Sequence, residues 1–345
     1  MKIKRFIYGI CSCLVLASLF AGCSGNIDVN EEKETLYLSA DVEEIIADGK
    51  TAVTFTVLYG TEDVTSQASI KCVSGNAELS GNSFVADAIG TYVFRAFYDD
   101  VVSEDFEVIA KSRFQRRVCV MEFTGTWCAQ CPAGATTLNF LISRTYKDQA
   151  FALAFHNDDP FALPVETELH TMFGCGSYPA YVTDMRDAGL LNDGGCSESI
   201  EKSLNESETH CSVSVSCSYD GSSGTVNVTS GIFSEKDASY RLAAYVIEDK
   251  VKGEQAQADG TVDKDYVHRH VVRQMLSASV KGDDMGRIAA GTEKTSSYSF
   301  AADKGWNMDN VSVAVLAVDE DGHVNNMAIC SADGGNMEYG YIKLI

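Results

Sequence analysis

The chain has 345 residues, and a length of this order predicts two or three domains. Hydrophobic residues make up 45% of the sequence, which is enough for packed cores and excludes general disorder. With 27 basic against 49 acidic residues, the net charge is -22 at pH 7. We therefore expect no nucleic acid partner, because the chain lacks the positive surplus that binding a phosphate backbone requires.

The N-terminus has the pattern of a bacterial export signal. Basic residues near the start precede an almost wholly apolar run over residues 7–20, which is too short to span a membrane comfortably. Small residues and Cys23 follow, as in a lipobox. We expect residues 1–23 to be a lipoprotein signal peptide, with a lipid on Cys23 as the membrane anchor and residues 24–35 as an acidic tether. An ordinary signal peptide is the alternative. Ser24 after the lipidated cysteine resembles outer-membrane sorting, on either the periplasmic or the outer face.

Two parts of the chain alternate apolar and polar residues with the period of two that predicts strands. In residues 36–110, such runs at 51–58 and 91–97 are separated by turn signals. This part predicts a β-sandwich and resembles bacterial immunoglobulin-like (Ig-like) domains. Residues 210–345 return to the same period and predict a second, C-terminal β-sandwich. Cys211 and Cys217 alternate with valines there and are expected in its core.

Between them, residues 113–208 change pattern. Strand-like runs at 118–123, 151–156 and 180–183 alternate with apolar residues spaced as on helices, and a last helix is expected over 197–205. The β-α-β-α-β order predicts an α/β domain.

A Cys-x-x-Cys pair, Cys128 and Cys131, follows the first of these strands and opens the first helix. Two intervening residues allow both sulfur atoms to join in one disulfide. At a helix N-terminus, free N–H groups and the helix dipole stabilise a thiolate. We expect Cys128 to be the exposed nucleophile and Cys131 the resolving thiol.

The order strand, Trp-Cys-x-x-Cys and helix resembles the thioredoxin family. The resemblance implies that Glu122 is the buried acid that assists proton transfer, and that Trp127 flanks the site. It also implies a cis-proline at Pro179, which would form the substrate platform together with the backbone of Tyr178. The sequence departs from the family in having Ala-Gln between the cysteines, and Glu in place of Asp as the acid.

Other interpretations of these polar residues stay open. The cysteine pair could be half of a zinc site, or an inert structural disulfide on a degenerate scaffold. His156 ends a strand near the expected active edge, and His268 and His270 are expected on the surface. The sequence around Asp319 predicts a hairpin turn. We expect no cofactor and no metal.

The longer pattern around the cysteines, together with the His-rich run at 266–271, resembles the twenty-eight-kilodalton outer membrane protein family of Bacteroidetes lipoproteins. The expected fold class is multidomain α/β plus β: an Ig-like β-sandwich (36–110), a thioredoxin-like α/β domain (113–208) and a C-terminal β-sandwich (210–345). The expected function is thiol–disulfide exchange with the thiols or disulfides of extracytoplasmic proteins. A non-enzymatic surface binding or adhesion protein is the alternative.

Overall fold

The structure is a computed structural model that describes residues 35–191, 194–206 and 209–342. The expected signal peptide, the lipidation site Cys23 and the tether up to residue 34 lie outside the described residues. Strands account for 50% of the structure and helices for 13%. In the part that is described, no helix has the length and apolar character needed to cross a membrane.

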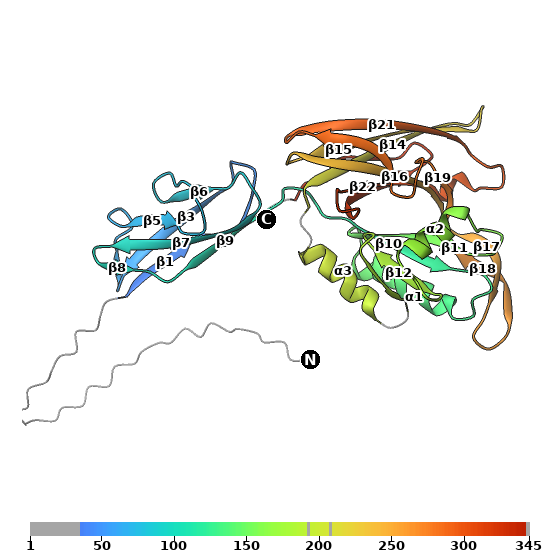
Figure 1. The fold of residues 1–345 in the computed structure, drawn as a ribbon, viewed down its shortest axis with the longest axis horizontal. Helices are drawn as coiled ribbons and strands as arrows, with labels where there is room; N and C mark the ends of the chain where they lie inside the picture. Colours follow the sequence, from blue (N-terminus) through green and yellow to red (C-terminus); the bar gives the residue numbers. More distant parts are fainter. Residues whose placement is uncertain (1–34, 192–193, 207–208, 343–345) are drawn as a thin grey trace, which may run out of the picture.

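The N-terminal lobe consists of two packed sheets, drawn in blue and cyan in Figure 1. One sheet has the order β1-β3-β4 with β6 beside β3, and the other has the order β2-β9-β7-β5 with β8 beside β7. Alternate residues of β3 are buried, and Phe55 meets Phe94 of β7 at 4.7 Å between ring centroids. The strands are β1 (Leu36–Ala40), β2 (Glu44–Ile46), β3 (Ala52–Tyr59), β4 (Glu62–Asp63), β5 (Ser69–Cys72), β6 (Ser83–Val85), β7 (Gly90–Tyr98), β8 (Val101–Val102) and β9 (Phe106–Lys111).

The rest of the chain is built on a nine-stranded sheet with the order β13-β12-β10-β11-β19-β16-β22-β23 and β20 beside β16. Its strands are β10 (Val118–Thr124), β11 (Ala150–His156), β12 (Ala180–Thr183), β13 (Asp187–Leu190), β16 (Ala238–Glu248), β19 (Val271–Met275), β20 (Asp283–Ile288), β22 (Val311–Val318) and β23 (Val324–Ser331). The helices are α1 (Cys131–Phe140), which continues into the π-helical turn η1 (Leu141–Thr145), α2 (Pro164–Met172), α3 (Gly195–Glu206) and the 3-10 turn η2 (Met308–Asn310).

This sheet curls so that its two halves enclose one core. Phe123 of β10 stacks on Phe155 of β11 at 5.8 Å, and Phe155 meets Tyr245 of β16 at 5.6 Å. Near the start of β10, the backbone N–H of Arg117 donates to the side chain of Asn326 in β23 at 3.0 Å. Strands that are far apart in the sheet order are therefore in contact. Helix α2 packs into this shared core, whereas α1 and α3 cover the other face of β10 and β11.

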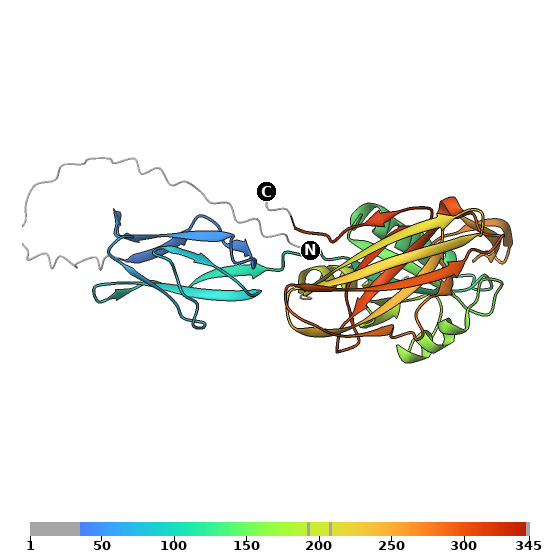
Figure 2. The ribbon, with the colours of Figure 1, turned by 90° about the horizontal axis from the view of Figure 1, so that it is seen from above.

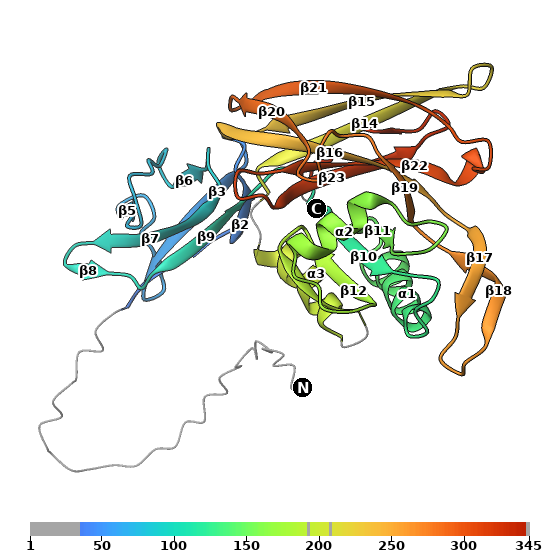
Figure 3. The same cartoon turned by 45° about the vertical axis from the view of Figure 1, so that its right-hand side comes forward.

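A second, four-stranded sheet with the order β21-β15-β14-β24 covers the outer face of β16 and β22. Figures 1 and 2 show these strands as a layer across one side of the body. Its strands are β14 (Cys211–Asp220), β15 (Thr225–Ser234), β21 (Thr292–Ala301) and β24 (Asn336–Met337). Cys211 and Cys217 are buried in the core between the layers, as expected. The hairpin of β17 (Val251–Ala256) and β18 (Val262–His268) projects from the body beside α1 (Figure 3).

The expected multidomain α/β plus β fold class, with a central thioredoxin-like α/β domain, is wrong. The structure is mostly β, and the strands of residues 113–208 do not form a sheet of their own. Strand β19, from much later in the chain, pairs in parallel with β11 at Ala154 and Val271, and carries the sheet onward into β16, β22 and β23. Burial patterns identify a strand but leave its sheet neighbours open, so the pattern could not reveal this continuation.

Candidate functional site

Cys128 and Cys131 form a disulfide at the start of α1, with sulfur atoms 2.10 Å apart. Cys128 is 5% exposed in this disulfide, so the expectation that it is exposed is wrong. Strand β10 ends at Thr124, a short turn carries Cys128, and Cys131 is the first residue of the helix. Pro132 follows at a first-turn position, where its missing N–H costs no helix hydrogen bond. The first turn of α1 contains no acidic residue. No acidic side chain there opposes the helix dipole, which in a reduced pair would stabilise a thiolate.

One side of the turn is held by the loop after β11. The indole N–H of Trp127 donates to the carbonyl of Asn157 at 2.8 Å, and the backbone N–H of Thr126 donates to Asp159 Oδ2 at 2.9 Å. Asp159 Oδ2 also lies 2.6 Å from His156 Nδ1, and both side chains are almost completely buried. Burial alone would raise the pKa of Asp159, but the hydrogen bond and charge of His156 bring this pKa below its usual value. The expected edge residue His156 is thus part of a buried pair under the disulfide turn.

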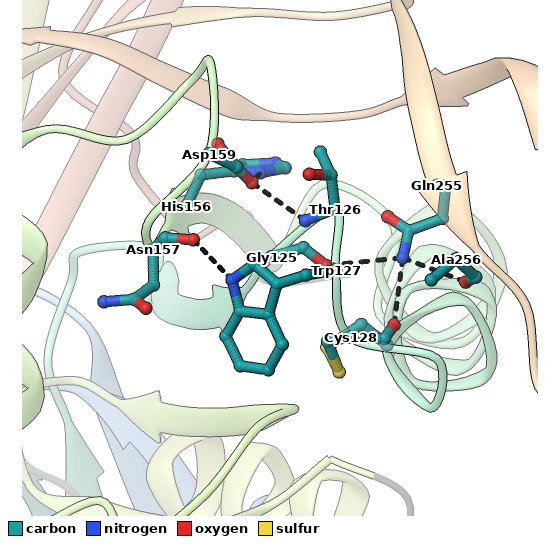
Figure 4. Close-up of a disulfide and its surroundings, with 10 residues drawn as sticks. Gly125, Thr126, Trp127, Cys128, His156, Asn157, Asp159, Gln255 and Ala256 are labelled. Carbon is teal, nitrogen blue, oxygen red and sulfur yellow. Dashed lines mark hydrogen bonds and ion pairs between the residues drawn. A yellow bond between two sulfur atoms is a disulfide. The ribbon is translucent and has the colours of Figure 1, made fainter. Parts of the chain in front are cut away.

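The other side of the turn is held by the β17–β18 hairpin (Figure 4). The side-chain amide of Gln255 donates to the carbonyl of Cys128 at 2.9 Å and to that of Gly125 at 3.3 Å. The backbone N–H of Ala256 donates to the carbonyl of Thr126 at 2.8 Å. Gln255 is only 2% exposed. Sequence reasoning missed this residue because it lies more than a hundred positions from the cysteines and has no motif of its own.

Behind Cys131 lies a cavity of about 120 Å³ between α1, the nine-stranded sheet and the hairpin. A space of this size holds several water molecules. Glu122 lines the cavity at 3% exposure, and its Oε1 has no hydrogen-bond partner in the structure. Burial raises the pKa of Glu122 to about 8. A carboxyl group in this state exchanges its proton near neutral pH.

His268 lines the same cavity and is 5% exposed, so the expectation that it lies on the surface is wrong. Its ring lies 5.2 Å from that of His156, and its Nε2 atom has no hydrogen-bond partner in the structure. Burial, together with the charge of His156, lowers the pKa of His268 to about 4. The lining of the polar cavity therefore includes two buried groups, Glu122 and His268, that are neutral near pH 7.

The expected platform residues lie beside the turn that carries the disulfide and the first residues of α1. The Tyr178–Pro179 peptide bond is cis, as expected. The rings of Trp127 and Tyr178 are 5.4 Å apart, and Trp127 is 49% exposed. The Tyr178 hydroxyl donates to the buried Glu166 at 2.6 Å, which fixes its ring. Pro179 packs so closely on α1 that a Cβ at Gly134 would lie 2.9 Å from its ring.

The segment around Asp319 forms the hairpin turn between β22 and β23, as expected. Asp319, Asp321 and His323 bring ligand atoms within 4.8 Å of one another. Asp319 Oδ1, however, accepts the backbone N–H groups of Asp321 and His323 at 3.1 and 2.9 Å. These bonds are those of an ordinary turn, so the cluster carries no argument for a metal.

A family model described as outer membrane protein Omp28 matches residues 167–331. The expected resemblance to this family is confirmed over these residues. The match begins within α2 and ends at the last residue of β23, so it does not include Cys128 or Cys131. No curated protein matches the chain.

Among solved structures, HBP35 of Porphyromonas gingivalis is similar to this chain with a TM-score of 0.54 and 20% identity, over 67% of this chain and 81% of that one. This likeness shows a related fold. A protein of Agrobacterium tumefaciens aligns over 65% of this chain and 98% of its own, at 18% identity and a TM-score of 0.43. The adhesin InvE of Yersinia pseudotuberculosis aligns over 89% and 58%, at 9% identity and a TM-score of 0.24. The TM-scores of these last two structures are too low to indicate a shared fold.

Proposed function

We propose that this protein is a lipid-anchored outer-membrane protein that exchanges thiols and disulfides with other extracytoplasmic proteins. The observation that carries the proposal is the arrangement at one helix N-terminus: a Cys128–Cys131 disulfide, with Glu122, whose Oε1 has no hydrogen-bond partner, on the cavity behind it. The match to the Omp28 model and the lipobox at Cys23 support the location. The partners are proteins whose thiols or disulfides can reach Cys128 beside the exposed Trp127.

The reduced site acts in two steps. The Cys128 thiolate attacks a disulfide of the partner, forms a mixed disulfide and releases one partner thiolate. The Cys131 thiol then loses its proton, attacks Cys128 and releases the second partner thiolate. The partner gains two electrons, and the site returns to the disulfide seen in the structure. Running the same steps backwards oxidises a partner dithiol.

Glu122 serves the second step. A thiolate at Cys131 is needed only after the mixed disulfide has formed, and Cys131 is 1% exposed. Bulk water therefore cannot take its proton directly. Glu122 and Cys131 line one cavity, and an ionised Glu122 can accept the proton through the water that such a cavity holds. The pKa of about 8 makes both the proton-accepting and the proton-donating form accessible near neutral pH.

The test follows the redox state of the pair. Purified protein is equilibrated in a series of dithiol and disulfide buffers and alkylated, and the peptide that contains both cysteines is quantified by mass spectrometry. We expect a reversible two-electron transition between about -120 and -270 mV, the range of catalytic pairs. Cys128→Ser should abolish dithiol-dependent disulfide reduction, whereas Cys72→Ser, a cysteine in the N-terminal lobe, should leave it unchanged. A pair that stays oxidised below about -300 mV would favour the non-enzymatic binding protein instead.

A further inference from the structure

Two cysteines outside the site lie against each other in the core between the two layers of strands. Cys217 belongs to β14 of the four-stranded sheet, and Cys330 belongs to β23 of the nine-stranded sheet. Their sulfur atoms are 3.5 Å apart, and each residue is 8% exposed. Both thiols are thus removed from water and directed at each other across the layers.

The path of the backbone explains why strands of different sheets approach so closely here. Facing sheets usually lie about 10 Å apart, which is too far for one disulfide. The chain leaves β23 at Ser331 and turns directly into β24, which pairs with β14. The N–H of Gly335 donates to the carbonyl of Ser331, and the N–H of Cys217 donates to the carbonyl of Gly335, both at 2.9 Å. This turn draws the two sheets together at the corner where the cysteines meet.

Only glycine fits at the end of this turn, directly before β24. A Cβ at Gly335 would lie 2.5 Å from the backbone nitrogen of Ser331. The close approach of the backbones is therefore built into the sequence and does not depend on the two cysteine side chains.

We propose that Cys217 and Cys330 form a second disulfide, which joins the two sheets covalently. The sulfur atoms need to close from 3.5 Å to about 2.0 Å. The oxidant is a small-molecule disulfide. The Cys217 thiolate attacks it and releases one thiol, and the Cys330 thiolate then displaces the second thiol from the mixed disulfide. The cysteine pair loses two electrons and two protons, and the oxidant becomes two thiols that carry them.

Because the pair is buried in the folded protein, this reaction takes place during folding. An oxidant reaches Cys217 and Cys330 while the layers are still open, because the folded protein leaves little of either residue exposed. Once formed, the bond is shielded from reductants by the same burial. The second disulfide is thus structural and separate from the exchange chemistry of Cys128 and Cys131.

The first test needs no substitution. Full-length protein is purified without reductant, alkylated while denatured, digested and analysed by mass spectrometry. We expect a cross-linked pair of peptides that contains Cys217 and Cys330. The proposal is overturned when both cysteines are recovered alkylated from protein in which Cys128 and Cys131 are recovered as a disulfide.

A second test measures the effect on stability. A strong reductant applied to denatured protein before refolding should lower the melting temperature of the wild type by more than that of the Cys217→Ala, Cys330→Ala double variant, because both proteins lose the Cys128–Cys131 disulfide and only the wild type loses the second one. Cys211→Ala, in the same strand and also buried, is the matched control and should keep the wild-type response to reductant. An equal response of the double variant and the wild type contradicts the cross-link. If the double variant does not fold, the peptide map of the wild type decides alone.

Discussion

The buried carboxyl group of Glu122 predicts an unusual pH dependence of stability. Its pKa is raised from 4.5 to about 8 by burial, so the folded protein holds this proton more tightly than the unfolded chain does. Its contribution is therefore fully present below pH 4.5 and is lost as the pH rises toward 8. The loss is about 1.4 kcal/mol for each pH unit, which amounts to about 5 kcal/mol across the interval.

Glu122→Gln removes this titration while it keeps the size and polarity of the side chain. We expect the variant to be similar to the wild type or slightly less stable at pH 5. At pH 8.5 we expect it to be more stable by several kcal/mol, on the order of the loss worked out above. The measurement is urea unfolding of both proteins at the two pH values. Comparing the difference between the proteins cancels every other titrating group.

Glu62→Gln is the control, because Glu62 lies exposed in β4 of the N-terminal lobe. Its effect on the free energy of unfolding should be the same at both pH values. A Glu122→Gln effect that is also the same at pH 5 and pH 8.5 would refute the argument, since it would mean that Glu122 titrates alike in the folded and unfolded states.

Three further substitutions probe the surroundings of the site. Gln255→Ala removes the hydrogen bond to the carbonyl of Cys128. It should shift the midpoint potential of the disulfide without changing the circular dichroism spectrum. An unchanged potential would show that Gln255 does not position the cysteine turn. Arg116→Met leaves Asp184 buried without its ion pair at 2.6 Å and should cost about 3–5 kcal/mol in urea unfolding, so a loss below about 1 kcal/mol would count against the pair. Gly134→Ala should cost about 1–3 kcal/mol by overpacking against the cis-proline ring, and an unchanged melting temperature would show that the contact relaxes freely.

The sequence allowed prediction of local elements and of the residues of the disulfide turn, but not of the sheet that joins them. Period-two alternation identifies β3 and β14, because each has one buried face. Strands β10 and β11 are buried on both faces, so their patterns do not say which strands lie beside them. The continuation through β19 could therefore not be predicted.

The candidate site was predicted in part for the same reason. Cys128, Cys131 and Glu122 lie within ten residues of each other, so spacing alone brings them together. Gln255 and His268 reach the site only because the hairpin folds back over α1. The alternation of residues in a strand does not show which of its two faces is covered by another part of the chain. For this reason the sequence wrongly predicted a surface position for His268.

The hairpin also sets the order in which the protein is completed. The amide of Gln255 that holds the cysteine turn lies 127 residues further along the chain than Cys128. Asn326, which accepts the N–H of Arg117 at the start of β10, is separated from it by 209 residues. During synthesis from the N-terminus, the two cysteines emerge long before the segments that lock their turn. Such distant contacts slow folding, because the entropy of closing a long loop is lost before the contact contributes any stabilising energy. The turn that carries the disulfide is thus completed last, when nearly the whole chain is present.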